Sequence, residues 1–160
     1  VSRVLTSHEL DVLDQILVTL AVGTEGQSMF DLCDSVGAYP IHALVVANTE
    51  ASLAISMNLF ACRPQLIMQE HSSAGPYGGE NNLHILAVNS REEQALKLID
   101  LAIASQMGTG VCDVQRLLTS QAEGIFFQKS PMYLFGGTPV AYACCSCLKR
   151  LLLRMLSTGC

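Results

Sequence analysis

Three short segments of the chain repeat one pattern of residues, and this recurrence constrains the fold more than any other feature. They begin at Gly37, Gly79 and Gly136 and read GAYPIH, GENNLH and GGTPVA. An isoleucine, leucine or valine stands four positions after each glycine. A proline precedes it in the first and third segments, and a histidine follows it in the first and second. Successive glycines are 42 and 57 residues apart. A pattern that recurs at such intervals predicts a chain built of stacked repeats.

Apolar residues at helical spacing follow each segment. They recur at i, i+3, i+4 and i+7, which is typical of a helix with one apolar face. The stripes are Leu53, Met57 and Phe60; Ala95, Leu98, Ile99 and Ala102; and Leu148, Leu151, Leu152, Met155 and Leu156. A further stripe follows Ser7, a suitable helix N-cap, within residues 8–22: Leu10, Leu13, Leu17, Leu20 and Ala21. The sequence therefore predicts an all-α fold, with a short inner and a longer outer helix in each repeat, and residues 8–22 as the outer helix of a preceding repeat.

Each signature residue of the pattern has a mechanical explanation. The glycine allows a tight turn, and Pro40 or Pro139 suits the first position of an inner helix. His42 and His84 stand where an imidazole can hydrogen-bond loop backbone. We therefore expect structural roles for these histidines rather than metal ligation or acid–base catalysis. The predicted structural positions are Gly37, Pro40, His42, Gly79, Leu83, His84, Gly136, Thr138 and Pro139.

The third segment, GGTPVAYA, resembles the G-x-T-P-L-H-x-A signature that opens an ankyrin repeat, and the other two segments follow the same template. The resemblance implies an ankyrin repeat solenoid. Because a plain ankyrin unit has 33 residues, the wider spacing places the additional residues in long finger loops. We expect a single array: residues 8–36 as a partial first repeat and finger, 37–78 as a repeat with finger, 79–135 as a repeat with a long finger, and 136–160 as a repeat truncated at its end.

Composition and motifs argue against several other classes of protein. Half of the residues are hydrophobic and 14% are charged, which argues against disorder, and the net charge of -5 gives no electrostatic basis for binding nucleic acid. The chain has seven cysteines, an odd number that does not suit the disulfide framework of a secreted protein, so we expect reduced, cytosolic thiols. The chain has no G-x-S-x-G, H-E-x-x-H, P-loop or C-x-x-C pair. We expect neither an enzyme nor a cofactor or metal site.

Residues 130–148 form a run of 19 residues without a charge, long enough to suggest a membrane span. Gly136, Gly137, Thr138 and Pro139 interrupt it, and they read as a turn followed by the start of a helix. No histidine lies near the closing cysteines at 144, 145 and 147 that could complete a zinc site. We interpret these cysteines as small residues that let two helices approach.

The residues between the second outer helix and Gly136, roughly 107–135, are too many for an ordinary loop. This finger carries four of the nine aromatic residues: Phe126, Phe127, Tyr133 and Phe135. Two interpretations are open. The rings form a surface that contacts a partner, or they pack on one another within the finger.

Two longer motifs resemble consecutive repeats in the cytosolic ankyrin domain of vanilloid-type transient receptor potential (TRPV) channels. These are PYGGENNLHILAVN at 76–89 and FFQKSPMYLFGGTPVAYACC at 126–145. The matching positions are Tyr77, Gly79, Leu83, His84 and Ile85, then Tyr133, Phe135, Gly136, Pro139, Ala143 and Cys145. Leu134, Gly137 and Ala141 depart from the family pattern, which implies a divergent member.

The resemblance implies the cytosolic, amino-terminal region of a tetrameric, calcium-permeable cation channel, at the cytoplasmic face of a membrane. It implies contacts with other channel subunits and regulatory proteins through the fingers and the concave face, with Tyr77, Glu80, Phe126, Phe127, Tyr133 and Phe135 as candidate contact residues. Some family members bind ATP there. Their nucleotide-binding lysines align with Ala38 and Ala43, so we expect no ATP site, although Tyr77 and Glu80 retain part of that surface.

Other functions are compatible with the same residues. The main alternative is a free-standing ankyrin adaptor that binds a protein partner through its fingers and concave face, and a more remote one is an ankyrin module fused to an enzyme. The sequence that follows Cys160 would separate them. Six apolar stretches of about 20 residues would indicate the channel, whereas a capping repeat with a polar outer face would indicate the adaptor.

Overall fold

The computed structural model describes residues 6–22, 28–129 and 134–158, and within these ranges the regular structure is helical. In chain order the elements are α1 (Ser7–Val22), the 3-10 helix η1 (Met29–Asp31), α2 (Pro40–Ala47), α3 (Glu50–Cys62), the 3-10 helix η2 (Pro64–Met68), α4 (Asn82–Val88), α5 (Glu92–Thr109), α6 (Val114–Thr119), α7 (Ile125–Lys129), α8 (Pro139–Cys145) and α9 (Lys149–Ser157). No strand occurs in the described ranges. The predicted all-α class is confirmed.

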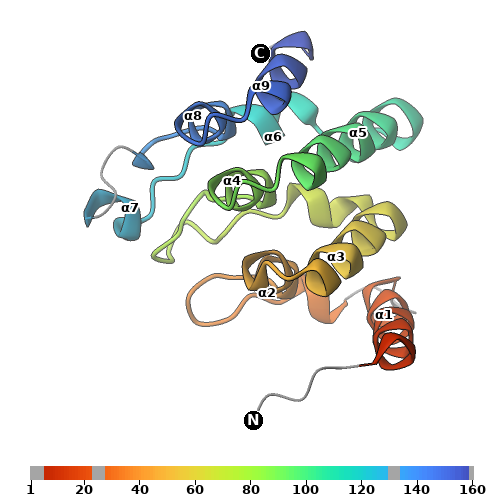
Figure 1. Cartoon of the computed structure of the whole chain (residues 1–160). Helices are drawn as coiled ribbons and strands as arrows, with labels where there is room; N and C mark the ends of the chain where they lie inside the picture. The colour runs from red at the N-terminus through yellow and green to blue at the C-terminus, as the bar shows by residue number, and fades with distance from the viewer. Residues whose placement is uncertain (1–5, 23–27, 130–133, 159–160) are drawn as a thin grey trace.

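Short and long helices alternate and form a stack (Figure 1). Within the described residues, the short helices α2, α4 and α8 each pack against the long helix that follows, namely α3, α5 and α9. The short helices also pack on one another in the order α2, α4, α8, and the long helices in the order α1, α3, α5, α9. The chain therefore proceeds through the stack one layer at a time.

The starts of the short helices are explained by their first residues. Pro40 and Pro139 occupy the first position of α2 and α8, as expected. The second segment lacks this proline, and Asn81 provides the helix start there instead. Its side-chain oxygen accepts the backbone N–H groups of Leu83 and His84, at 3.0 and 3.1 Å. An asparagine at this N-cap position satisfies donors that would otherwise lack a partner.

The glycines of the three segments adopt left-handed backbone conformations. Gly37 and Gly79 have a φ of 80° and Gly136 has a φ of 69°. Two of the turns also lie against the backbone of a later connection. A Cβ on Gly79 would be 2.1 Å from the carbonyl oxygen of Gln121, and one on Gly37 would be 2.7 Å from the Cβ of Ser72. The predicted tight turns are present, and they are also sites of close approach.

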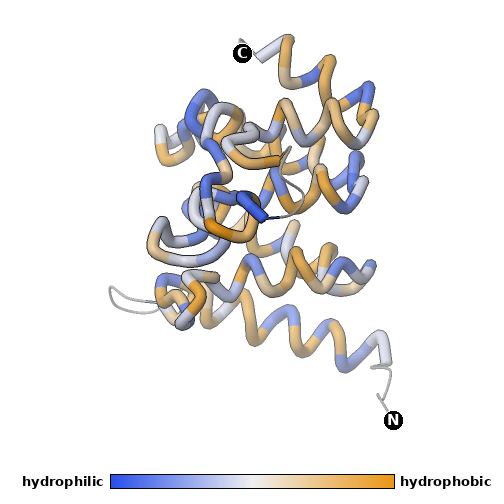
Figure 2. The backbone as a smooth tube through the Cα atoms, turned by 90° about the vertical axis from the view of Figure 1, so that its left-hand side faces the viewer, coloured by the Kyte–Doolittle hydropathy of each residue, from blue (hydrophilic) through white to orange (hydrophobic). Residues whose placement is uncertain are grey.

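The core is formed by buried apolar residues that both the short and the long helices contribute. Figure 2 shows hydrophobic residues recurring along the helices of the stack. Most of the predicted stripe residues are buried: Leu53, Met57, Phe60, Ala95, Leu98, Ile99, Ala102, Leu148, Leu151 and Met155. Two expectations fail at the ends of the stack. Leu156 is 58% exposed and Leu20 is 44% exposed, because no described helix covers those sides of α9 and α1.

The long finger is not one loop. α5 continues to Thr109, and the connection beyond it contains α6 and α7. Asp113 accepts the backbone N–H of Arg116 at 3.0 Å and so caps α6, which buries Leu117 and Leu118. The segment predicted as a long finger, 107–135, therefore contains helices that the sequence did not predict, and it has apolar residues of its own to bury.

The interpretation of the clustered cysteines is also wrong. α8 ends at Cys145, and Cys147 lies beyond it with a φ of 55°. Cys144, Cys145 and Cys147 are all exposed, whereas the buried residues of α8 are Pro139, Tyr142 and Ala143. The close approach of α8 to its neighbours therefore depends on Ala143 rather than on the cysteines. Within the described ranges, no helix combines the length and the apolar character that crossing a membrane requires.

We predict that Gly79→Ala destabilises the protein more than Gly110→Ala. Both glycines have a positive φ, but a Cβ on Gly110 would meet open space. Gly110→Ala should therefore cost about 1 kcal/mol for the backbone conformation, whereas Gly79→Ala must also displace the carbonyl of Gln121. Urea unfolding of both variants measures the difference, and equal losses in the free energy of unfolding would contradict the close approach.

Candidate functional site

The connections at 63–81 and 110–138 meet at a cluster of aromatic rings. The rings of Tyr77 and Phe126 have centroids 4.9 Å apart, and those of Phe126 and Phe127 are 5.4 Å apart. Backbone hydrogen bonds join the same segments, since the N–H of Phe126 donates to the carbonyl of Pro76 at 3.0 Å and that of Gly124 to Gly78 at 3.1 Å. We call Tyr77, Phe126 and Phe127 the finger aromatics. They connect one finger to the next.

The predicted contact residues differ in their accessibility. Phe126 is 44% exposed and Phe135 is 45% exposed, while Phe127 is 2% exposed and also contacts Tyr142. Phe127 thus packs on neighbouring rings, as the second interpretation predicts. Its buried ring is not available to a partner, so the predicted partner contact through Phe127 is wrong. Phe126 and Phe135 remain available to a partner. Tyr133 lies outside the described residues.

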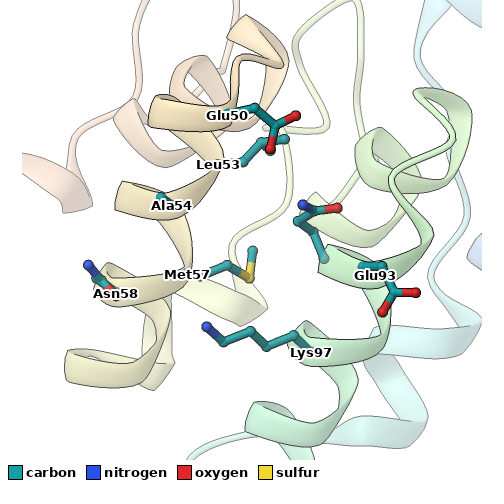
Figure 3. A pocket seen from close by; sticks show the side chains of 8 residues that line it. Glu50, Leu53, Ala54, Met57, Asn58, Glu93 and Lys97 are labelled. Carbon is teal, nitrogen blue, oxygen red and sulfur yellow. The ribbon is translucent and has the colours of Figure 1, made fainter. Parts of the chain in front are cut away.

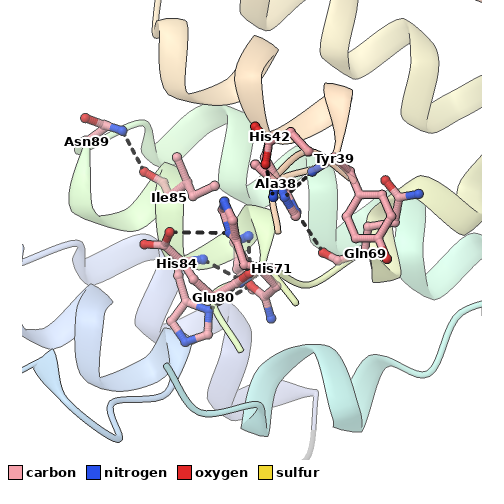
Figure 4. Close-up of polar contacts among 12 residues, drawn as sticks. Ala38, Tyr39, His42, Gln69, His71, Glu80, His84, Ile85 and Asn89 are labelled. Atoms are coloured by element: carbon pink, nitrogen blue, oxygen red, sulfur yellow. Dashed lines mark hydrogen bonds and ion pairs between the residues drawn. The ribbon is translucent and has the colours of Figure 1, made fainter. Parts of the chain in front are cut away.

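The signature histidines bind backbone beyond their own helix pairs (Figure 4). The Nδ1 of His42 accepts the N–H of Tyr39 at 3.3 Å, so its Nε2 carries the proton that is donated to the carbonyl of Gln69 at 3.1 Å. His84 repeats this arrangement, accepting from Asn81 at 3.1 Å and donating to the carbonyl of Gly137 at 3.1 Å. The expected hydrogen bonds from these histidines to loop backbone are present.

Burial determines the charge state of these histidines. It lowers the pKa of His42 to about 4, and the neighbouring His71 adds to this effect. Burial likewise lowers the pKa of His84 to about 4. Both imidazoles are therefore neutral near pH 7, in agreement with the tautomers that their hydrogen bonds require.

His71 and Glu80 were not recognised as a pair from the sequence. The ring of His71 stacks on that of His42, with centroids 4.1 Å apart, and its Nδ1 lies 3.6 Å from Oε2 of Glu80. Burial lowers the pKa of His71 and raises the pKa of Glu80 to about 7. Burial therefore disfavours the charged form of each group, and with it an ion pair between them.

The position of Glu80 changes its expected role. Glu80 is 9% exposed, and its carboxyl group faces the buried His71. A carboxyl group in this position cannot serve as part of an accessible contact surface, so its predicted partner-binding role does not agree with the fold. Among the residues that the structure describes, no group of three or more histidines, cysteines and acidic residues is arranged to hold a metal ion.

Sequence reasoning missed Asn81 and His71. Asn81 donates through its side-chain amide to the carbonyl of Leu117 at 3.0 Å, which ties the start of α4 to α6. Its position before Leu83, matching Thr138 in the third segment, is a readable N-cap signal. His71 lies in a connection without periodic residues, so nothing in the local sequence indicates its stacking on His42.

A groove of about 430 Å³ runs between α3 and α5 (Figure 3). Leu53 and Met57 form its apolar floor, and Glu50 and Glu93 stand at its edge. These carboxylates already have partners, since Glu50 pairs with Arg91 at 2.7 Å and Glu93 pairs with Arg150. Lys97 also lines the groove, and the described lining contains no histidine, serine or cysteine.

A smaller hollow of about 320 Å³ contains Ala38 and Ala43, the two positions at which the resemblance described above places nucleotide-binding lysines. Asp34 also lines it, and hydrogen bonds from the backbone N–H groups of Ala38 and Val36 lower the pKa of its carboxyl group. The lining described here contains a carboxylate and no cation. A phosphate group would therefore meet repulsion in this hollow.

A scan against protein-family models gives no match, and a search of curated proteins finds no similar chain.

We predict that calorimetric titration with ATP gives no saturable binding to the 160-residue chain. The hollow with Ala38 and Ala43 has no cation to hold the phosphates and presents Asp34 instead. Tight binding with a defined stoichiometry would contradict this prediction.

We predict that Glu80→Gln changes how stability depends on pH. The pKa of Glu80 is about 7 in the fold against 4.5 ordinarily, so the unfolded chain loses its proton first and stability falls as the pH rises through this window. Glu80→Gln removes that loss, and its free energy of unfolding relative to the wild type should rise by on the order of 1 to 3 kcal/mol between pH 4.5 and 7.5. Urea unfolding at each pH measures this effect.

The exposed Glu123 provides the matched control, since Glu123→Gln should leave the profile unchanged. Both variants should still lose stability as the pH falls below 6.5, the ordinary pKa of histidine. There, unfolded His42 and His84 take up protons that the folded imidazoles, with a pKa of about 4, do not bind. Parallel profiles for Glu80→Gln and the wild type would show that Glu80 is not held neutral.

Proposed function

We propose that this chain is an array of ankyrin repeats that binds protein, and that it belongs to the cytosolic region of a TRPV-like cation channel. The observation that carries the repeat assignment is the repeated histidine bridge. His42 and His84 each bind the turn of their own unit and the backbone beyond their helix pair, at Gln69 and Gly137. Short and long helices that stack in order around such bridges support a solenoid of this type.

A binding role agrees with the form of the molecule. Repeat stacks generally present an extended surface to which a partner can bind. Phe126 and Phe135 leave nearly half of their surface open, and aromatic side chains are enriched in the buried centres of protein interfaces. The groove and the hollow described above hold no arrangement of reactive groups, so we propose binding rather than catalysis.

The channel assignment rests on the two motifs around Gly79 and Gly136. In the fold these motifs provide the turns that join α4 and α8 to the fingers, and the first also contributes Tyr77 to the finger aromatics. We propose that the finger face contacts other subunits of the channel, in a homo- or heterotetramer, and regulatory proteins at the cytoplasmic face of the membrane. The membrane contact itself would come from the rest of the channel.

The test uses the full-length protein that contains this chain, expressed with two different tags in the same cells. We expect it in the membrane fraction, with the second tag recovered by purification through the first. Phe126→Ala should reduce that recovery severalfold, because a half-exposed aromatic side chain at the centre of a contact commonly contributes 1 kcal/mol or more.

Met107→Ala is the matched control, since Met107 is an apolar side chain that is 85% exposed and lies on α5 rather than among the finger aromatics. Phe127 is unsuitable for this test, because its burial makes Phe127→Ala a folding variant. Recovery in the soluble fraction alone would favour the free-standing adaptor. Unchanged recovery with Phe126→Ala would argue against the finger contact.

A further inference from the structure

Three cysteines cluster where α8 ends and the chain turns into α9, and the proposed function does not use them. Cys144 and Cys147 are three positions apart and form a C-x-x-C pair, so the expectation that the chain contains no such pair is wrong. Cys145 lies between them. The other described cysteines each stand alone in the sequence: Cys33, Cys62 and Cys112. Segment 144–147 is therefore a place where two thiols can be joined locally.

The backbone holds the two ends of this pair close together. The N–H of Cys147 donates to the carbonyl of Cys144 at 3.1 Å, and Ser146 has a φ of -86° and a ψ of 3°, as at the third position of a type I turn. Such a turn brings its first and fourth Cα atoms within about 7 Å, and a disulfide needs about 4.4 to 6.8 Å. Cys144 and Cys145 are less suitable, because the Cα atoms of adjacent residues are about 3.8 Å apart. The turn therefore favours a bond between Cys144 and Cys147.

The exposure of Cys147 is a property of the turn itself. Ser90 holds the same place in the preceding helix pair, eleven positions after the signature glycine, and the two residues have φ values of 56° and 55°. Ser90 is exposed although a further helix pair follows it in the stack. Cys144 corresponds instead to Ala87, which is buried. Cys147 thus occupies the accessible position of the pair and Cys144 the more sheltered one.

We propose that the turn between α8 and α9 is a site of reversible oxidation, at which a hydroperoxide converts Cys144 and Cys147 into a disulfide. The sulfur of Cys147 attacks hydrogen peroxide, the O–O bond breaks, one water leaves and a sulfenic acid forms. The sulfur of Cys144 then attacks the sulfenic sulfur, the S–O bond breaks and a second water leaves. The two thiol protons end in the water, and two electrons pass from the sulfurs to the peroxide.

The modified turn adjoins a contact between successive helix pairs. Oε1 of Glu92, at the start of α5, accepts the backbone N–H groups of Arg150 and Leu151 at 2.9 and 3.1 Å. Both residues lie at the start of α9, directly after the turn. A disulfide would therefore fix the segment that brings α9 to α5. This chemistry does not depend on the proposed binding function.

Mass spectrometry of the dilute chain after treatment with hydrogen peroxide tests the proposal. Trypsin cleaves after Lys129 and Lys149, so one peptide, 130–149, contains all three clustered thiols. We expect this peptide to lose two hydrogens and to regain them with dithiothreitol. Cys33 and Cys62 provide the internal control, since they are exposed but have no cysteine beside them. Their peptides should gain oxygen instead, because no neighbouring thiol resolves the sulfenic acid.

Three variants identify the pair. Cys147→Gly removes a thiol where the left-handed φ suits glycine, so it should fold like the wild type and lose the disulfide. Cys144→Ser should also lose it and accumulate a sulfenic acid at Cys147, which dimedone traps. Cys145→Ser is the matched control and should form the disulfide as the wild type does. A disulfide that persists in Cys147→Gly or Cys144→Ser, or a wild-type peptide that only gains oxygen, would overturn the proposal.

Discussion

At Gly79 the backbone approaches the carbonyl of Gln121 so closely that a Cβ would be 2.1 Å from its oxygen, and the left-handed φ of 80° independently favours glycine. This close approach places the turn of one unit against the connection that leads to the next. The histidine five positions later then reaches backbone on the far side, as His84 does at Gly137. The spacing of the helix pairs, and with it the packing of the core, depends on these turn contacts.

This arrangement buries ionisable groups whose charged forms burial disfavours. Burial moves the pKa of His42 and His84 down to about 4 and that of Glu80 up to about 7, so the fold is opposed by both acid and alkali. His71, in the connection 63–81, stacks on His42 of α2. The connection 63–81 is therefore held against α2 by the hydrogen bond of His42 to Gln69 and by the stacked imidazoles.

The accessible surface is apolar at the fingers and at both ends of the described stack. At the fingers, adjacent residues of α7 divide the roles, because Phe127 fills the space beside Tyr77 and Tyr142 while Phe126 stays half exposed. At the ends, α1 and α9 each bury one side and expose another. The described stack thus leaves apolar side chains accessible both at the fingers and on its first and last helices.

The sequence by itself determined the helical class, the three turns, most of the buried stripe residues and the backbone bonds of His42 and His84, because these depend on local periodicity and on special residues at fixed positions. The tertiary structure decided that α6 and α7 fold within the long finger, that Phe127 and Glu80 are buried, and that Cys144, Cys145 and Cys147 are exposed. Local pattern could not decide these points, since adjacent residues such as Phe126 and Phe127 have the same chemistry. Which of them is covered depends on segments such as 76–80 that are distant in sequence.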